Sequence, residues 1–287
     1  MAEELEFTIR TIYFPRKGRA GKRKTSLISG FPDVNTTGVQ SGIILTPQSG
    51  DWTISTPGVY ENKHNTGGSV IINANNVTLR NCRCEVNSSA SGSSTVIYVN
   101  PGKTGVIIEY CEVTANGVEG VKGIWPDGAN GTEIRYCDVS GCEDCVFSFA
   151  NNLYIHDNYF HDQANVGADP HMDSVQLVGI GNIVEHNTMV ATFNQNSIFA
   201  IGDNVASNDI TVNNNLMRSG PNMLCPFNIG DTANAFTCVY RVTNNVIEEG
   251  HVGAGNKYLT WNGIHPATIW TGNTDYVTGA TIPNPTA

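Results

Sequence analysis

The sequence has no apolar run of about 18 residues and nowhere shows the apolar spacing of an amphipathic helix. The first absence excludes a membrane-spanning helix, and the second excludes a helical fold. No charged segment followed by an apolar one opens the chain, so we expect no secretory signal and synthesis in a cytoplasm. Basic residues are scarce after residue 25, where nine Lys and Arg stand against 23 Asp and Glu, whereas residues 1–25 carry seven against three.

Eight segments of the chain align without gaps, and in each the sixth residue is cysteine or asparagine. Successive sixth residues lie 29, 26, 21, 29, 28, 30 and 28 positions apart. A period near 28 residues is typical of a solenoid, in which each turn buries its apolar face against its neighbours. The segments are VTLRNCRC, VIIEYCEV, TEIRYCDV, LYIHDNYF, NIVEHNTM, ITVNNNLM, YRVTNNVI and TIWTGNTD, with Cys82, Cys111, Cys137, Asn158, Asn187, Asn215, Asn245 and Asn273 at the sixth place.

Within each segment apolar and polar residues alternate, which is the period of a β-strand. A second short apolar run precedes each segment, so every turn should contain two or three short strands, parallel to their equivalents in the next turn. This pattern predicts a parallel β-helix of about eight to nine coils. The preceding runs are VIIN at Val70, TVIYV at Thr95, GIW at Gly123, CVFSF at Cys145, DSVQL at Asp173, NSIFAI at Asn196, MLCPF at Met223 and LTW at Leu259.

The repeated asparagines and cysteines are predicted to be structural. An asparagine at a bend can pass an amide hydrogen bond to the asparagine of the next turn, and this forms a ladder. The cysteines are expected to be buried free thiols, because parallel in-register side chains are poorly aimed for a disulfide. Five aromatic residues are predicted to lie in the core: Phe147, Phe149, Tyr159, Phe160 and Phe199.

Residues 1–28 are predicted to form an extended basic arm, and residues 29–287 the β-helix domain. The arm is basic and the body is strongly acidic. Docking of the arm on an acidic protein surface is favoured over a merely solvated terminus and over nucleic-acid binding, because the acidic body would repel a polyphosphate. The predicted docking residues are Arg16, Lys17, Arg19, Lys22, Arg23 and Lys24.

The body, over roughly residues 30–280, resembles the pectate-lyase-like family of right-handed parallel β-helix proteins. The resemblance is carried by a lead-in, SGFPDVNTTGVQSGIILTPQSGDWTI, and by coils such as NANNVTLRNCRC and GNIVEHNTMV. It implies an all-β, single-stranded, right-handed parallel β-helix. Members of the family include polysaccharide lyases, glycoside hydrolases, epimerases and bacteriophage tail spikes. A basic arm without a signal segment resembles the phage members most.

Superposition of the second strands places four polar residues two positions before an apolar residue, on one edge of the coil: Lys122, Asp144, Asp173 and Asn196. The sequence HMDSVQL resembles the family's H-x-D-G-x-Q stretch, with Ser174 in place of the glycine. Glu143–Cys145 resembles the paired-aspartate motif of polygalacturonase-type hydrolases, whose later G-H-G and R-I-K motifs are absent. The candidate catalytic residues are Asp144, Asp173 and His171, and the candidate substrate-binding residues are Lys122, Glu143, Gln176, Asn194, Gln195 and Asn196.

Two carboxylates about 5 Å apart tend to share a proton or to recruit a cation. Calcium is therefore conceivable, although no metal site or cofactor is predicted. Nearby carboxylates should raise the pKa of Lys122, which makes it a poor base for a lyase. Three interpretations stay open: a polar ladder on a solvated edge, sugar binding without turnover, and catalysis.

The sequence favours a bacteriophage virion protein, assembled in the host cytoplasm, over an enzyme. It would be a minor tail protein, a tail spike or a capsid decoration protein. Its expected partners are other virion proteins, bound through the arm, a host-surface polysaccharide and further copies of itself, with a trimer as one arrangement. Neither a membrane nor a nucleic acid is an expected partner. The alternative is a polysaccharide lyase or glycoside hydrolase, which would be secreted.

Overall fold

The structure is a computed structural model. The part of the chain that it describes contains thirty short strands, joined by turns and bends, and no helix. None of these residues forms a helix that could cross a membrane. Residues 1–31 and 32–287 form two separate units. The described residues are 10–12, 25–27, 29–87, 94–164, 172–191, 199–201, 209–218, 227–229, 239–249, 259–261 and 267–284.

In the first unit, β1 (Arg10–Ile12) pairs with β2 (Thr25–Leu27) in an antiparallel two-stranded sheet, sheet A. The six predicted docking residues of the basic arm lie between these strands and outside the described residues. The docking role of the arm therefore stays a prediction.

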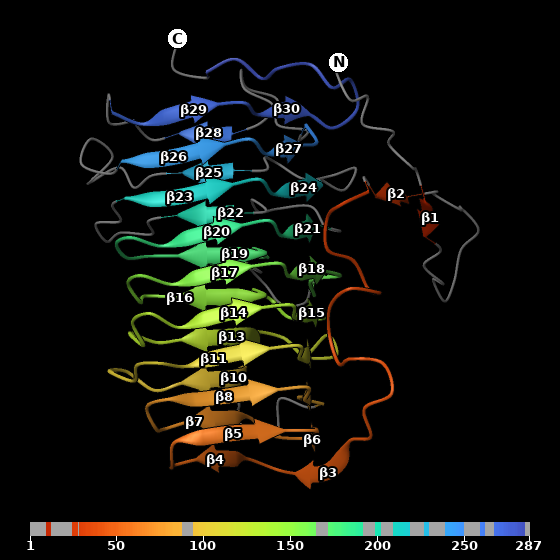
Figure 1. Ribbon diagram of the computed structural model, residues 1–287, viewed down its shortest axis with the longest axis vertical. Helices are drawn as coiled ribbons and strands as arrows, with labels where there is room; N and C mark the ends of the chain where they lie inside the picture. The colour runs from red at the N-terminus through yellow and green to blue at the C-terminus, as the bar shows by residue number, and fades with distance from the viewer. Residues whose placement is uncertain are drawn as a thin grey trace, which may run out of the picture. The chain divides into compact units, whose positions relative to one another are not determined.

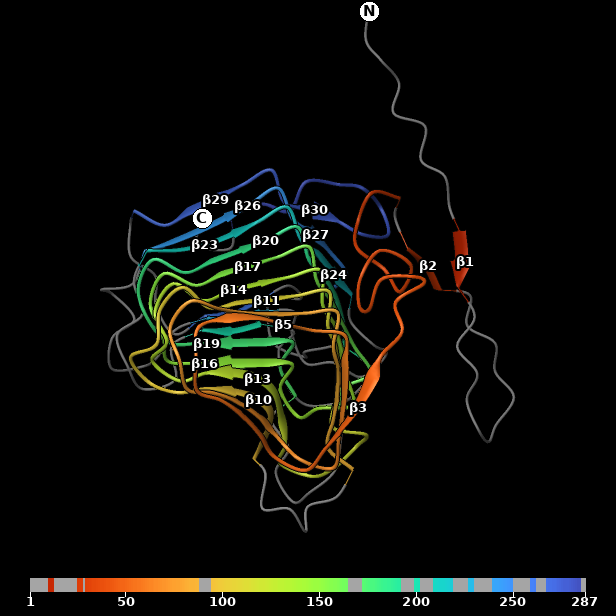
Figure 2. The ribbon, with the colours of Figure 1, turned by 60° about the horizontal axis from the view of Figure 1, so that its bottom comes forward.

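The second unit is a stack of nine coils, each of which runs through three parallel sheets in the order C, D, B (Figures 1 and 2). The parallel β-helix predicted from the repeat is confirmed. Sheet C contains β4 (Trp52–Ile54), β7 (Val70–Ile72), β10 (Thr95–Val99), β13 (Lys122–Pro126), β16 (Val146–Ser148), β19 (Val175–Leu177), β22 (Phe199–Ile201), β25 (Phe227–Ile229) and β28 (Leu259–Trp261).

Sheets D and B complete each coil, and β3 precedes the first coil as an additional strand of sheet B. Sheet D contains β5 (Gly58–Glu61), β8 (Val77–Arg80), β11 (Ile107–Glu109), β14 (Glu133–Arg135), β17 (Tyr154–His156), β20 (Ile183–Glu185), β23 (Ile210–Asn213), β26 (Tyr240–Thr243) and β29 (Ile269–Thr271). Sheet B contains β3 (Thr46–Ser49), β6 (Lys63–Thr66), β9 (Arg83–Glu85), β12 (Glu112–Thr114), β15 (Asp138–Ser140), β18 (Tyr159–His161), β21 (Thr188–Val190), β24 (Leu216–Arg218), β27 (Val246–Ile247) and β30 (Thr274–Asp275).

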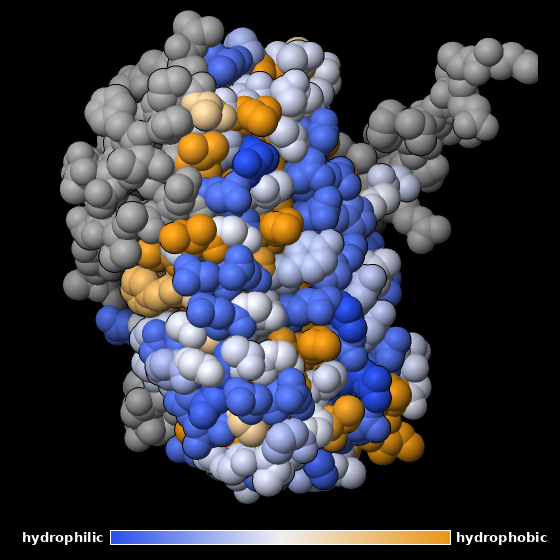
Figure 3. Space-filling model, turned by 60° about the vertical axis from the view of Figure 1, so that its left-hand side comes forward, coloured by the Kyte–Doolittle hydropathy of each residue, from blue (hydrophilic) through white to orange (hydrophobic). Residues whose placement is uncertain are grey.

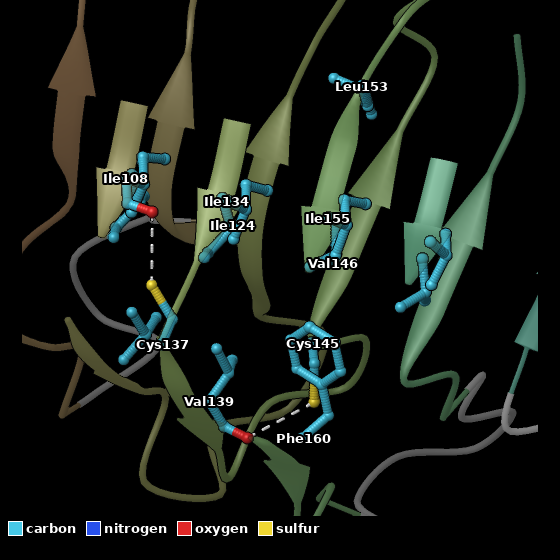
Figure 4. Packing of buried hydrophobic residues seen from close by; sticks show 14 of the residues in the cluster. Ile108, Ile124, Ile134, Cys137, Val139, Cys145, Val146, Leu153, Ile155 and Phe160 are labelled. Carbon is cyan, nitrogen blue, oxygen red and sulfur yellow. Dashed lines mark hydrogen bonds between the residues drawn. The ribbon is translucent and has the colours of Figure 1, made fainter. Parts of the chain in front are cut away.

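The core lies between the three sheets, because alternate residues of each short strand point inward. Figure 4 shows Ile108, Ile134 and Ile155 of sheet D facing Ile124 and Val146 of sheet C, with all five side chains fully buried. Most places in the inward columns repeat β-branched or other apolar residues from coil to coil, with Ser148 and Asn65 among the polar exceptions. Every coil therefore buries its apolar face on the coils above and below it, as the repeat predicted.

The bend from sheet D to sheet B is the most regular corner of the coil. In every coil it starts with a residue in the left-handed region, with φ between 50° and 70°, and in coils two to nine the next residue is the sixth residue of the aligned segments. The left-handed residues are Asn62, Asn81, Tyr110, Tyr136, Asp157, His186, Asn214, Asn244 and Gly272.

The five asparagines that follow this bend form the predicted ladder. The Oδ1 atom of each rung after Asn158 accepts hydrogen bonds from the backbone N–H and the Nδ2 of the preceding rung, at 2.9–3.0 Å. Each Nδ2 also donates to a sheet D carbonyl of the preceding coil, at 2.8–3.0 Å. All five side chains are fully buried, so the ladder satisfies polar groups that water cannot reach.

Cys82, Cys111 and Cys137 occupy the same column in earlier coils. Each thiol lies 3.6–3.8 Å from the sheet D carbonyl that an asparagine amide would contact. Figure 4 shows this contact for Cys137 and the Ile108 carbonyl. Together with Cys84, Cys142 and Cys145 they are buried free cysteines, as predicted for the cysteines in the described residues.

The strand pairings confirm the gapless alignment of the eight segments but correct part of the second set of runs. The run at Met223 overlaps the observed β25 only at Phe227. The run at Asn196 contains β22, but Val175 pairs with Phe199, whereas the predicted superposition paired it with Ile198. The run places apolar residues on both strand faces, so alternation could not fix the register.

The lead-in segment lies beside the bend from sheet D to sheet B. An Asx turn at Asp33, in which Asp33 Oδ1 accepts from the Asn35 N–H at 2.8 Å, starts the segment. The Gly38 N–H then donates to the Tyr136 carbonyl at 2.8 Å, and the Gln40 N–H to Asn81 Oδ1 at 3.1 Å. The segment therefore borders sheets D and B, at the corner of the coil opposite sheet C.

Candidate functional site

Three of the predicted polar residues stand in one column at the bend from sheet B to sheet C. Ile124 pairs with Val146, and Val146 pairs with Val175, so Lys122, Asp144 and Asp173 occupy equivalent places two residues earlier. With Glu143 they are called here the polar column. The sequence superposition brought these residues together correctly.

Direct contacts join the members of the polar column. Lys122 Nζ lies 3.0 Å from Glu143 Oε1 and 3.0 Å from Asp144 Oδ2. The other oxygen of Asp144, Oδ1, accepts a hydrogen bond from the Asp173 N–H at 3.1 Å. Asp144 is thus held from both sides, by a lysine of the coil below and by the backbone of the coil above.

Asp144 and Asp173 are buried and Lys122 and Glu143 are half-buried, so the polar column is not a fully solvated edge. The side chain of Lys122 is 17% exposed, that of Glu143 13% and that of Asp144 0%. Burial raises the pKa of Asp144 to about 6, although Lys122 acts in the opposite direction. Burial alone would lower the pKa of Lys122, but Asp144 and Glu143 outweigh it and the net shift is upward, as the sequence predicted.

A row of aromatic side chains lies next to the polar column, on the outer face of sheet C. Tyr98, Trp125, Phe147 and Phe149 are arranged edge to face, with successive ring centroids 5.5, 5.1 and 5.0 Å apart. Tyr98 Oη donates to Asp127 Oδ2 at 2.7 Å. Lys122 Nζ stands 5.6 Å from the centre of the Phe147 ring, which links this aromatic row to the polar column.

The aromatic row corrects the prediction for two aromatic residues. Phe147 lies between the inward-facing Val146 and Ser148 and points outward, and Phe149 is 42% exposed. Tyr159 and Phe160 are buried, whereas the side chain of Phe199 lies outside the described residues. Tyr98 and Trp125 were not among the candidate residues predicted from the sequence, although their alternation with Ile97, Val99 and Ile124 marks them as outward-facing.

The remaining predicted site residues are only partly placed. Gln176 lies on β19, buried, in the outer row next to Phe147. Gln163, which was not among the predicted site residues, follows β18, is buried and donates from Nε2 to Ser174 Oγ at 2.8 Å. His171, Asn194, Gln195 and Asn196 lie outside the described residues, so their proposed roles stay predictions.

Another titratable cluster lies on sheet B. His161 Nε2 is 2.8 Å from Asp138 Oδ1, and His161 Nδ1 is 2.9 Å from Asp162 Oδ2. Burial lowers the pKa of His161, but the two carboxylates outweigh burial and raise it to about 9. The imidazole is therefore charged near neutral pH and clamps two aspartates, which indicates a structural role.

No group of three or more His, Cys, Asp or Glu within the described residues is arranged to hold a metal ion. If calcium bound at the polar column, Glu143, Asp144 and Asp173 would supply the carboxylate oxygens that it prefers.

The side of the molecule with the bends from sheet C to sheet D shows scattered apolar residues among polar ones, with no single large apolar patch in view (Figure 3).

Comparison with known proteins finds similarity among solved structures. No sequence family matches the chain, and no curated protein sequence matches it. Among solved structures, the chain is similar to a pectin methylesterase from Yersinia enterocolitica, with 10% sequence identity and a TM-score of 0.36 over 89% of this chain and 93% of that one. The assignment as a parallel β-helix rests on the strand pairings of the chain itself.

Proposed function

We propose that this protein is a polysaccharide-cleaving β-helix, a glycoside hydrolase or polysaccharide lyase, whose substrate lies along the aromatic row. The supporting observation is that the aromatic row, on the outer face of sheet C, adjoins the acid–base cluster of the polar column at the bend that leads into this sheet. Sugar rings offer C–H faces that aromatic side chains can cover, and hydroxyl edges for polar groups. Tyr98, Trp125 and Phe147 lie on three successive coils and Phe149 extends the row along the last of them, which suits a chain of repeated sugar units.

Hydrolysis is favoured over elimination at this site. A lyase needs a base that removes a proton, but Lys122 is held protonated by two carboxylates. Asp144, with a pKa raised to about 6, can retain a proton at weakly acidic pH and act as a general acid. Asp173, on the next coil, provides the second carboxyl group that most glycosidases use.

The proposal is tested by incubating the protein with a panel of plant, bacterial-capsule and cell-wall polysaccharides. We expect new reducing ends without unsaturated products, and activity that declines as the pH rises above about 6, where Asp144 loses its proton. Asp144→Asn should lower the rate by roughly a hundredfold or more. The matched control is Asp162→Asn, which changes a 57% exposed carboxylate directly after β18 that pairs with His161 and not with Lys122, and which should leave the rate unchanged.

Unsaturated products would show that the protein is a lyase and not a hydrolase. If no substrate gives any product, the proposal that the protein cleaves polysaccharides is wrong. A melting curve of each variant shows whether a lost rate reflects lost folding.

Glycan binding without turnover, in a virion protein, is the second candidate function. Both oxygens of Asp144 are engaged and its side chain has no exposed surface, which favours a structural carboxylate. Residues 1–31 also form a separate unit, as expected of an attachment segment. Deletion of residues 1–28 should then leave a folded β-helix that no longer joins the particle. Normal incorporation of this truncated protein into virions would contradict the attachment role.

A further inference from the structure

The arginines of residues 32–287 all lie on sheets D and B. The five are distributed as three on sheet D and two on sheet B, and each forms an ion pair with a carboxylate. The pairs are Arg80 with Glu61, Arg135 with Glu109, Arg241 with Asp209, Arg83 with Glu112, and Arg218 with Glu248. No arginine therefore belongs to a sheet C strand, where the aromatic row lies.

The surroundings of the aromatic row are acidic. In described residues 94–164 and 172–191, sheet C and its flanking bends contain two lysines, Lys103 and Lys122, against six carboxylates. Lys122 is bound to two of those carboxylates, which leaves Lys103 at the bend after β10. The six are Glu119, Asp127, Glu143, Asp144, Asp162 and Asp173.

We propose that the glycan recognised by the aromatic row carries no carboxylate or sulfate groups. This inference rests on the proposed function, because it assigns a substrate class to the same surface. The acidic groups around the row repel a polyanion, and this repulsion reduces both its encounter rate and its affinity. An uncharged sugar chain does not meet that penalty.

The chemistry of the row also lacks what a polyuronate needs. Acidic sugars are held by arginine forks or lysine ammonium groups, which form charge-assisted hydrogen bonds to each carboxylate. Here a carboxylate, that of Asp127, contacts the row directly and accepts from Tyr98 Oη at 2.7 Å. A carboxylate can accept hydrogen bonds from sugar hydroxyl groups but not from a sugar carboxylate. The polar groups beside the row therefore match hydroxyl groups.

The test is calorimetric titration of the full-length protein with defined hexasaccharides. The neutral set contains β-1,4-linked glucose, mannose, xylose and N-acetylglucosamine, and the acidic set contains galacturonate and mannuronate, each with calcium and with a chelator. We expect at least one neutral hexasaccharide to bind, with an affinity that changes less than about twofold with salt. No acidic hexasaccharide should bind.

Variants show whether the binding uses the aromatic row. Trp125→Ala should weaken binding by roughly tenfold or more. Phe149→Ala, at an exposed position with less risk to folding, should weaken it in the same direction. The matched control is Tyr154→Ala, which removes an aromatic ring that is 37% exposed on sheet D and should leave the affinity unchanged.

Binding of an acidic hexasaccharide that depends on Trp125 or Phe149, with or without calcium, would overturn the substrate class while leaving the proposed function intact. If no hexasaccharide or longer polysaccharide of either set binds in a manner that depends on these residues, the proposed function itself is wrong.

Discussion

Replacement of Asn187 by leucine removes one rung from the middle of the asparagine ladder. Asn187 Oδ1 accepts from the Asn158 N–H at 3.0 Å and from Asn158 Nδ2 at 2.9 Å, and Asn187 Nδ2 donates to the Ile155 carbonyl at 2.9 Å. Leucine is similar in size but can neither accept nor donate. The backbone N–H of Asn158 would lose its partner at a fully buried position, and the Ile155 carbonyl would lose a donor.

An unpaired buried donor costs about 1–3 kcal/mol, and we add about 1 kcal/mol for the carbonyl. The expected loss of unfolding free energy is therefore about 2–4 kcal/mol, measured as a lower urea midpoint. Stacked coils can open locally, so hydrogen exchange at the Asn158 amide is the second measurement. A local loss of about 2 kcal/mol should accelerate that exchange roughly 30-fold.

Two further variants separate the ladder from side effects of leucine. Asn187→Cys should be intermediate, because cysteine occupies this column in three earlier coils and its thiol can still face the Ile155 carbonyl. Asn73→Leu, at an exposed turn residue, should change the stability by less than about 0.5 kcal/mol. If Asn187→Leu leaves both the midpoint and the Asn158 exchange rate unchanged, the ladder does not stabilise the fold.

Three other changes test the structure. Cys137→Asn should add a rung below Asn158 and raise the unfolding free energy by about 0.5–1.5 kcal/mol in urea titration; a lower midpoint would show that this coil cannot accept an amide. The pKa of His161 is raised to about 9, so its contribution to the unfolding free energy is complete below about pH 6.5 and is lost as the pH rises through 9. His161→Gln should abolish this decrease of unfolding free energy with pH. The pKa of Asp144 is raised to about 6, so on acidification the folded state binds a proton before the unfolded state does, and the unfolding free energy should increase as the pH falls from 6 toward 4. Asp144→Asn should remove this pH dependence. If the variant shows the same dependence as the original protein, Asp144 has an ordinary pKa.

The fold could be predicted because one corner of the coil has a constant length. In coils two to nine the bend from sheet D to sheet B contains one left-handed residue followed by one rung residue, so strand, bend and strand align without gaps. The other two bends vary in length, which explains why the sheet C strands were placed less well. Both errors concern a strand that follows such a variable bend: the predicted position of the strand at Phe227, and the predicted pairing of Val175 with Ile198 in place of Phe199.

The site was predicted in part, for the same reason. Correct register placed Lys122, Asp144 and Asp173 on neighbouring coils, but their burial depends on how the chain turns at the corner before sheet C, which alternation does not reveal. The aromatic row was missed because Phe147 and Phe149 are apolar residues on an outward face. An outward apolar side chain leaves no polar alternation in the sequence, so a run such as CVFSF resembles a strand that is buried on both faces.

At the bend from sheet D to sheet B, two coils have a tyrosine at the left-handed position, and stacking of the two rings offsets part of the conformational cost. Tyr110 and Tyr136 adopt left-handed φ values of 51° and 52°, a conformation that costs an ordinary residue about 1–2 kcal/mol. Their rings stack 4.7 Å apart at an interplanar angle of 10°, and such stacking contributes about 0.5–1.5 kcal/mol. Both tyrosines precede cysteine rungs, whereas every asparagine rung follows Asp, His, Asn or Gly. Where the inner ladder is weakest, ring stacking on the outer side of the same bend therefore helps to hold neighbouring coils in register.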